Sequence, residues 1–111
     1  MIYPAGKSKY RNVRTEADGL KFASKKEAKR WVDLQLLQNA GRVKMLQRQV
    51  PIDCEVNGII VCRYVCDFSF EEYRHRKWIS VWEDAKGYQT PIYRLKKKLM
   101  LACHGIEIRE T

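Results

Sequence analysis

The 111-residue sequence lacks the features that mark membrane, secreted or zinc-binding proteins. No apolar run approaches the roughly 20 residues that a membrane-spanning helix needs, and the first residues lack the apolar segment of a signal peptide. The four cysteines include no C-x-x-C pair, and the only two histidines, His75 and His104, are isolated, so we expect no zinc site. We therefore expect free thiols, a cytoplasmic location and no membrane partner.

Acidic residues are the minority among the charged side chains. The chain has 22 Lys and Arg against 13 Asp and Glu, which gives a formal net charge of +9. This balance in a small protein favours a polyanionic partner, with nucleic acid first and an acidic membrane second. Hydrophobic residues make up 45% of the chain, which is enough for a core and excludes wholesale disorder. The length allows one domain with one core.

The N-terminal part of the sequence shows no hydrophobic periodicity. Residues 5–19 are polar and rich in Lys, Arg and Gly, so residues 1–21 are predicted to form an irregular basic arm and residues 22–111 the folded domain. Ser24 and Glu27 fit a capping box, in which Ser24 caps a helix and Glu27 reaches back to its backbone. This helix is predicted to end at Gly41, and its apolar positions are spread widely enough to pack on two sides.

Three strand-like stretches follow the first helix. The sequence Asn57-Gly58 is a strong hairpin signal between the first two strands, and the second is rich in residues that favour strands. The predicted strands cover residues 43–56, 59–70 and 78–85, with a turn at 71–77.

A second helix begins at Thr90, its cap, with Pro91 in the first turn, and ends at Gly105. Its predicted core face consists of apolar residues at three-and-four spacing: Ile92, Leu95, Leu99, Ala102 and Cys103. Met100 and Leu101 are outside this face, where exposed apolar side chains would suit a homodimer interface. A short last strand is predicted at residues 106–109. The order helix, three strands, helix, strand predicts a single compact α/β domain with a mixed sheet.

Carboxylates near the ends of two adjoining strands form the most informative pattern. Asp84 and Lys86 alternate onto one face of the third strand, and Glu83 points the other way. If the hairpin turns near His75, Asp67 on the second strand comes to lie beside Asp84. Two converging carboxylates repel each other unless a cation lies between them, and such an oxygen-rich pair suits Mg²⁺. Taken alone, an Asp-x-Lys triplet is also a common solvated ion pair on an exposed strand.

This pattern resembles the motif of the PD-(D/E)XK nuclease superfamily, an Asp on one strand and D/E-x-K on the next. The superfamily's restriction-endonuclease-like core has the same order of elements, and the resemblance covers residues 22–110. It is closest to a small phage-encoded family of endonuclease-like proteins of unknown function, whose signatures match residues 24–28, 87–91 and 93–96. Junction-resolving nucleases of the superfamily add a glutamate from the first helix, matched by Glu27, and often a glycine after the lysine, matched by Gly87. Cys66 stands where the superfamily's name has proline.

The resemblance implies metal-dependent hydrolysis of a phosphodiester. Asp67 and Asp84 would hold Mg²⁺, with Mn²⁺ as a substitute and the Ala85 carbonyl as a further ligand, and Lys86 would orient the attacking water or stabilise negative charge. Glu27 would be a third ligand, a helix cap, or both. The implied protein is a phage-encoded endonuclease of the host-cell cytoplasm that acts on branched or recombining DNA such as a Holliday junction. A homodimer would match the two symmetry-related cleavage sites of a four-way junction.

Basic residues around the expected site would neutralise phosphates. The candidates for nucleic-acid binding are Arg94, Lys96, Lys97 and Lys98 with Tyr93 on the second helix, and Lys7, Lys9, Arg11 and Arg14 on the arm. A run of lysines is also the usual solvated face of a helix. On the first strand, alternation places Arg48 and Gln49 on opposite faces, so at most one is expected in the cleft. Gln49 would contact the site through a water, and Arg48 would contact a phosphate. Either could instead be an exposed strand residue, and this is the preferred interpretation for Arg48.

Two other functions fit the sequence: a non-catalytic nucleic-acid-binding protein and an RNA-directed nuclease. The first would rely on the basic helix and arm alone. The set of Asp67, Asp84 and Lys86 favours a nuclease over a binder, because a binder does not need carboxylates facing a phosphate.

Overall fold

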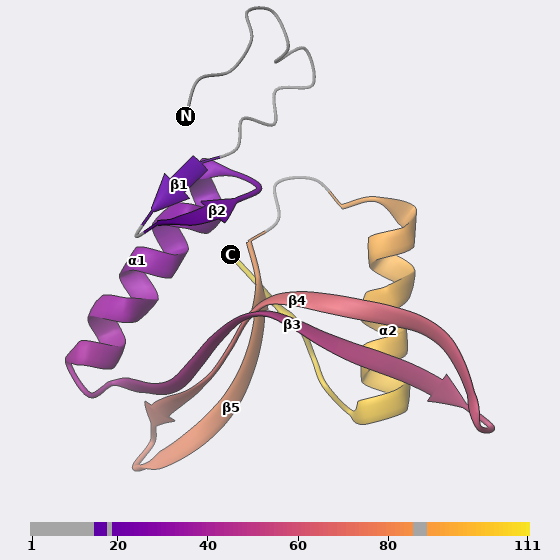
Figure 1. Cartoon of the computed structure of the whole chain (residues 1–111). Coiled ribbons are helices and arrows are strands. Elements are labelled where there is room, and N and C mark those ends of the chain that lie inside the picture. Colours follow the sequence, from indigo (N-terminus) through magenta and orange to yellow (C-terminus); the bar gives the residue numbers. More distant parts are fainter. Residues whose placement is uncertain (1–14, 18, 86–88) are drawn as a thin grey trace, which may run out of the picture.

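The computed structural model describes residues 15–17, 19–85 and 89–111 of the chain (Figure 1). Of the candidate residues, Lys7, Lys9, Arg11, Arg14, Lys86 and Gly87 lie outside the described residues. The elements are, in chain order, β1 (Thr15–Ala17), β2 (Leu20–Phe22), α1 (Lys25–Asn39), β3 (Val43–Val56), β4 (Ile59–Arg74), β5 (Lys77–Asp84), α2 (Pro91–His104) and β6 (Arg109–Glu110). The predicted single α/β domain with a mixed sheet is confirmed.

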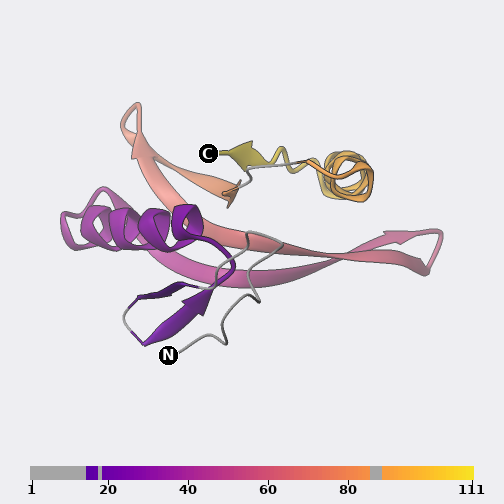
Figure 2. The same ribbon diagram turned by 90° about the horizontal axis from the view of Figure 1, so that it is seen from above.

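The main sheet has the strand order β3-β4-β5-β6. The first two neighbouring pairs are antiparallel hairpins, and β6 lies parallel to β5 after the crossover through α2. Figure 1 shows β3 and β4 as a long bent hairpin, with α1 near one half and α2 near the other. Seen from above in Figure 2, the β3–β4 hairpin extends below α2, and the β4–β5 turn projects away from α1.

Two segments differ from the predicted boundaries. β4 continues to Arg74, whereas residues 71–77 were expected to form the turn. Glu71 and Glu72 stay in the ladder opposite Ser80 and Ile79, because backbone pairing with β5 outweighs the low strand propensity of the glutamates. The predicted irregular arm is also wrong at its end: residues 15–17 pair with residues 20–22 in a small separate sheet, and Gly19 supplies the positive φ of 76° at the connection.

The start of α1 confirms the predicted capping box. Ser24 Oγ accepts a hydrogen bond from the Glu27 N–H at 3.1 Å, and Glu27 Oε1 accepts one from the Ala23 N–H at 3.3 Å. Packing on two sides holds for the first half of the helix, where the Trp31 ring lies 6.2 Å from Phe68 of the sheet and 6.4 Å from Phe22 of β2. The second half does not follow the prediction, since several of its apolar side chains are exposed.

The predicted core face of α2 is partly confirmed, because Leu99 and Cys103 pack against the buried cluster, but the rest of the face differs. Tyr93 and Met100 face the sheet, and Met100 is fully buried against Cys54. Ile92 and Leu95, which were expected in the core, are 66% and 58% exposed. Both sets of residues have helical spacing, so the pattern alone does not select between the two faces. Leu101 stays exposed, but Met100 is excluded from the dimer surface expected around it.

Two apolar clusters hold the domain together. Under α1, Leu34 packs with side chains of β3, β4 and β5, and under α2, Met100 packs with side chains of β3, β4 and the segment before β6. Along β4, α2 therefore packs against the part up to Cys66, and α1 packs against the part from Phe68 onward. Within the described residues, no helix is long and apolar enough to cross a membrane.

Candidate active site

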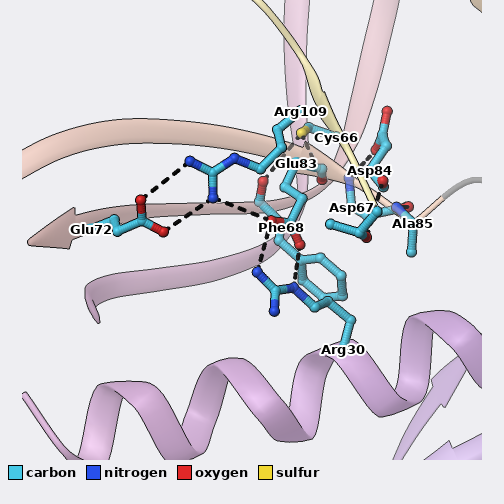
Figure 3. Close-up of polar contacts among 10 residues, drawn as sticks. Arg30, Cys66, Asp67, Phe68, Glu72, Glu83, Asp84, Ala85 and Arg109 are labelled. Carbon is cyan, nitrogen blue, oxygen red and sulfur yellow. Dashed lines mark hydrogen bonds and ion pairs between the residues drawn. The ribbon is translucent and has the colours of Figure 1, made fainter. Parts of the chain in front are cut away.

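Asp67 and Asp84 lie side by side on β4 and β5. Phe68 pairs with Glu83, and the same register places Asp67 opposite Asp84. The Asp67 N–H donates a hydrogen bond to Asp84 Oδ1 at 2.8 Å, and the Ala85 N–H donates one to Asp67 Oδ2 at 3.0 Å (Figure 3). Asp67 is 8% exposed and Asp84 is fully buried. Asp67 therefore lies beside Asp84, as the hairpin register predicted.

Glu27 reaches the same region from the start of α1. Gln49 Nε2 donates to Glu27 Oε2 at 2.9 Å and lies 3.5 Å from Asp67 Oδ1, so one amide links the helix carboxylate to the strand carboxylate. Glu27 is 3% exposed. It therefore forms part of the helix cap and shares the Gln49 amide with Asp67. These residues line a cavity of about 350 Å³ with Lys21, Phe22, Ala23 and Arg48.

The expectation that only one of Arg48 and Gln49 faces the cleft is wrong, because both line this cavity. Gln49 has a positive φ of 54°, and the β3–β4 register shifts between Lys44 and Gln47, so simple alternation fails here. Arg48 is not an ordinary exposed residue. Its guanidinium lies 4.4 Å from the Phe22 ring centroid and 3.9 Å from Glu27 Oε2, and it donates to the Lys21 carbonyl oxygen at 2.9 Å.

The donor chemistry of the site fits Mg²⁺ held through few protein ligands. Among the described residues, no three Asp, Glu, His or Cys side chains lie close enough to hold a metal by themselves. Two aspartates and a nearby backbone carbonyl are oxygen ligands, and Mg²⁺ commonly takes one or two carboxylates with waters and substrate phosphate. The site thus suits a cation completed by water and substrate more than one enclosed by protein.

The opposite face of β5 carries a buried ion pair. Glu83 is fully buried and accepts two hydrogen bonds from Arg30 of α1, with Nη2 to Oε1 at 3.0 Å, while Arg109 of β6 lies 3.9 Å away (Figure 3). The Glu83 carboxylate raises the pKa of the Arg30 guanidinium. Arg109 in turn makes a bidentate contact to Glu72 of β4, at 3.1 and 3.2 Å. The predicted opposite orientation of Glu83 is confirmed, and these contacts fasten β5 to α1, β4 and β6.

Cys66 occupies the position before Asp67. Its Sγ lies 3.2 Å from the carbonyl oxygen of Phe68 and 3.4 Å from that of Glu83, and burial raises the pKa of the thiol to about 11. Cys66 is therefore a neutral packing residue between β4 and β5.

On the other side of Asp84, α2 contributes polar groups. Asp84 lines a cavity of about 270 Å³ with Tyr93, Lys96, Arg63 and four other residues. Lys96 Nζ donates to the Arg63 carbonyl oxygen at 3.1 Å. The expected surface position of Tyr93 is wrong, because its ring packs edge-on against Tyr64, with centroids 6.3 Å apart.

The carboxylate of Glu110 on β6 accepts hydrogen bonds from three polar side chains. Tyr93 Oη and Lys97 Nζ donate to its Oε2 at 2.8 and 3.0 Å, and Gln89 Nε2 donates to Oε1 at 2.7 Å. Lys97, together with Tyr93, lowers the pKa of Glu110, while burial and the Glu110 contact raise the pKa of Tyr93. Lys97 and Tyr93 thus have partners within the fold, and Arg94 and Lys98 are exposed.

Over residues 7–110 the sequence matches a protein family described as Protein of unknown function (DUF1064). The chain belongs to this family. No curated protein and no solved structure matches it. The DUF1064 match covers all four of Glu27, Asp67, Asp84 and Lys86.

Two site features of this DUF1064 chain were missed from the sequence. The first is the direct contact of Gln49 with both Glu27 and Asp67, which depends on a backbone angle that glutamine seldom adopts. The second is the Arg30–Glu83 pair. The predicted orientation of Glu83, opposite to Asp84, could have indicated such a pair, because a buried carboxylate requires a partner.

Proposed function

We propose that this chain is a Mg²⁺-dependent DNA endonuclease of the PD-(D/E)XK type, acting on branched DNA. The observation that carries the proposal is the buried Asp67–Asp84 pair on adjacent antiparallel strands, each aspartate held by a backbone N–H. Two further features support the resemblance to PD-(D/E)XK nucleases. They are the order of helices and strands and the position of Glu27, which lies near Asp67 at the start of the first helix.

The chain's own residues would orient the ligands before substrate arrives. Asp84 Oδ1 is fixed by the Asp67 N–H, and Asp67 Oδ2 by the Ala85 N–H, so the direction of each carboxylate is set by the strand backbone. Glu27 is held by the Ala23 N–H on one oxygen and by Gln49 on the other. Bound Mg²⁺ would supply Lewis-acid polarisation of the phosphoryl oxygen and a lower pKa for a bound water. Lys86 directly follows Ala85 and would orient that water or stabilise the developing charge.

Cations flank the aspartates on two sides. Lys21 and Arg48 line the cavity that Asp67 shares, and Arg63 and Lys96 line the cavity that Asp84 shares. A phosphate backbone crossing the pair would meet positive charge before and after the scissile position. The preference for branched DNA, and a homodimer matching the symmetry of a junction, follow from the resemblance of Glu27 to the glutamate of junction-resolving nucleases.

The test is a panel of labelled substrates incubated with Mg²⁺ or with chelator. Linear, nicked, flapped and four-way-junction DNA are compared with RNA of the same sequence. We expect junction DNA to be cut only with Mg²⁺. Glu55→Gln, which changes an exposed carboxylate near the end of β3, should behave as wild type. Binding without cleavage of any substrate would indicate a non-catalytic binder, and selective cutting of RNA would indicate an RNA-directed nuclease.

A further inference from the structure

The turn between β4 and β5 carries a concentration of positive charge that the proposed site does not use. Its four residues, Arg74, His75, Arg76 and Lys77, are all exposed, and we call them the basic tip. Both ribbon views show this end of the hairpin projecting from the body of the domain (Figures 1 and 2). Arg42, whose carbonyl oxygen accepts the Tyr73 N–H at 3.1 Å, joins two basic-tip residues around a cavity of about 420 Å³.

The residues at the turn itself are unusual for their backbone. His75 and Arg76 have φ values of 53° and 63°, the left-handed region that two-residue hairpin turns of type I′ require. The β3–β4 hairpin of the same chain uses Asn57 and Gly58, at 51° and 80°, the pair that this turn favours. Histidine and arginine fit this conformation less well, and such strain is typical of functional positions. His75 and Arg76 therefore occupy a turn for which Asn-Gly is the less strained sequence.

The charge of the basic tip is only partly neutralised within the fold. Arg74 pairs with Glu72 at 3.1 Å, but Glu72 also binds Arg109. Within the part of the chain that the structure describes, no acidic side chain forms an ion pair with Arg42, Arg76 or Lys77. These exposed cations are free to neutralise an external anion.

Two aromatic side chains lie beside the basic tip. Tyr73 and Trp78 are 46% and 38% exposed, with ring centroids 5.3 Å apart, and Lys44 Nζ lies 4.3 Å from the Trp78 ring centroid. Cations interleaved with exposed aromatic rings are typical of nucleic-acid-binding surfaces. A projecting two-stranded ribbon is also a shape that proteins place against DNA grooves.

We propose that the basic tip binds the phosphate backbone of a duplex arm that extends from the cleavage site. This inference rests on the proposed function, since it takes DNA as the substrate. Seven residue steps along β5 separate Lys77 from Asp84, which is at most about 23 Å at the rise of a strand. At about 3.4 Å per base pair, the basic tip would contact phosphates up to about 7 base pairs from the scissile one.

The test compares wild type with the triple variant His75→Asn, Arg76→Gly, Lys77→Gln. This variant installs the Asn-Gly turn of the other hairpin and removes two cations, so its melting temperature is expected to equal or exceed that of wild type. Lys25→Gln with Lys29→Gln, two exposed changes on α1, is the control for the loss of two charges. Binding is measured by fluorescence anisotropy in chelator, on junctions with loop-closed arms of about 5 or about 15 base pairs.

We expect the triple variant to bind long-arm junctions about 10-fold more weakly, with the slope of log K against log salt reduced by about 2. On short arms the difference from wild type should largely vanish. Unchanged binding to long arms, or an equal loss in the Lys25 and Lys29 control, would overturn the inference. So would tighter wild-type binding to phosphatidylserine vesicles than to DNA, abolished in the triple variant, because the tip would then be a membrane contact.

Cleavage in Mg²⁺, measured on the same junctions, separates the two proposals. If wild type cuts DNA and the triple variant binds it normally, the role of the basic tip is contradicted and the nuclease proposal is not. A wild type that cuts nothing, beside a triple variant with weakened binding to long arms, supports the basic tip and contradicts the nuclease.

Discussion

The backbone N–H of Asp67 donates a hydrogen bond to the carboxylate of Asp84, 2.8 Å away across β4 and β5. Asp67 in turn accepts the N–H of Ala85, the residue that follows Asp84. Each strand therefore positions the carboxylate that belongs to the other. This reciprocal contact accounts for how two buried aspartates keep fixed directions at the end of a hairpin.

Divalent metal should stabilise the fold through this pair. Two buried carboxylates repel each other when both are ionised, and a cation that binds only the folded state offsets this. Mg²⁺ at about 100 times its dissociation constant would add about 2.7 kcal/mol to the free energy of unfolding, or a rise in melting temperature on the order of 10 °C. Calorimetry with Mg²⁺ and with chelator measures this. Asp84→Asn should abolish the response, and Glu55→Gln, an exposed change on β3, should keep it. An equal response in both variants would contradict the metal site.

Gln49 should act on metal binding more than on stability. Gln49→Gly keeps the positive φ without strain but removes the amide that links Glu27 and Asp67. We expect a nearly unchanged melting temperature and a roughly 10-fold higher Mg²⁺ concentration for half-maximal cleavage. Met45→Gly is the matched control, because Met45 has a φ of 58° and is 65% exposed. A positioning role for Gln49 is wrong if both variants have the same Mg²⁺ dependence.

The four free cysteines should fall into two classes of reactivity. Burial raises the pKa of both Cys54 and Cys66 to about 11, so their thiols stay protonated near neutral pH. Cys62 and Cys103 are only half-buried. A chromogenic disulfide reagent should therefore modify two thiols quickly in the native protein and all four after unfolding. Fast reaction of all four native thiols would show that the core around Cys54 and Cys66 is open.

Acid should weaken the contact between β4 and β6. Arg109 lowers the pKa of Glu72 below its ordinary value of 4.5. Because this pKa is lower in the folded state, the stability that Glu72 contributes is present above about pH 4.5 and is lost as the pH falls through the folded-state pKa. Urea midpoints measured from about pH 6 to about pH 3 should fall less steeply in Glu72→Gln than in wild type. Glu107→Gln, an exposed change, should follow the wild-type curve, and a Glu72→Gln curve parallel to wild type would contradict the assignment.

The sequence was sufficient to predict the strand pairing that forms the site. Residues that favour strands located the second strand. A turn near His75 was then enough to place Asp67 opposite Asp84, because the register of a hairpin follows from its turn. The caps of both helices were also predictable, since Ser24 and Thr90 bond to nearby backbone groups within their own segments.

Only part of the buried face of α2 could be predicted: Leu99 and Cys103 pack against the core as expected. The remainder of that face and the backbone of Gln49 could not be predicted. Tyr93 with Met100, and Ile92 with Leu95, both follow helical spacing, and the choice between them depends on where the β3–β4 hairpin lies. The positive φ of Gln49 has no signal in its residue type, because the left-handed region favours glycine and asparagine. Tertiary packing decides both features.

The most direct test of the proposed function is single-turnover cleavage of a four-way junction in Mg²⁺ by wild type and by Asp84→Asn. Binding of the same junction is measured alongside in chelator. We predict that wild type cuts the junction, and that Asp84→Asn cuts it at least about 100-fold more slowly while binding it with similar affinity. Cleavage by Asp84→Asn at the wild-type rate would contradict the proposal that the Asp67–Asp84 pair is the catalytic centre.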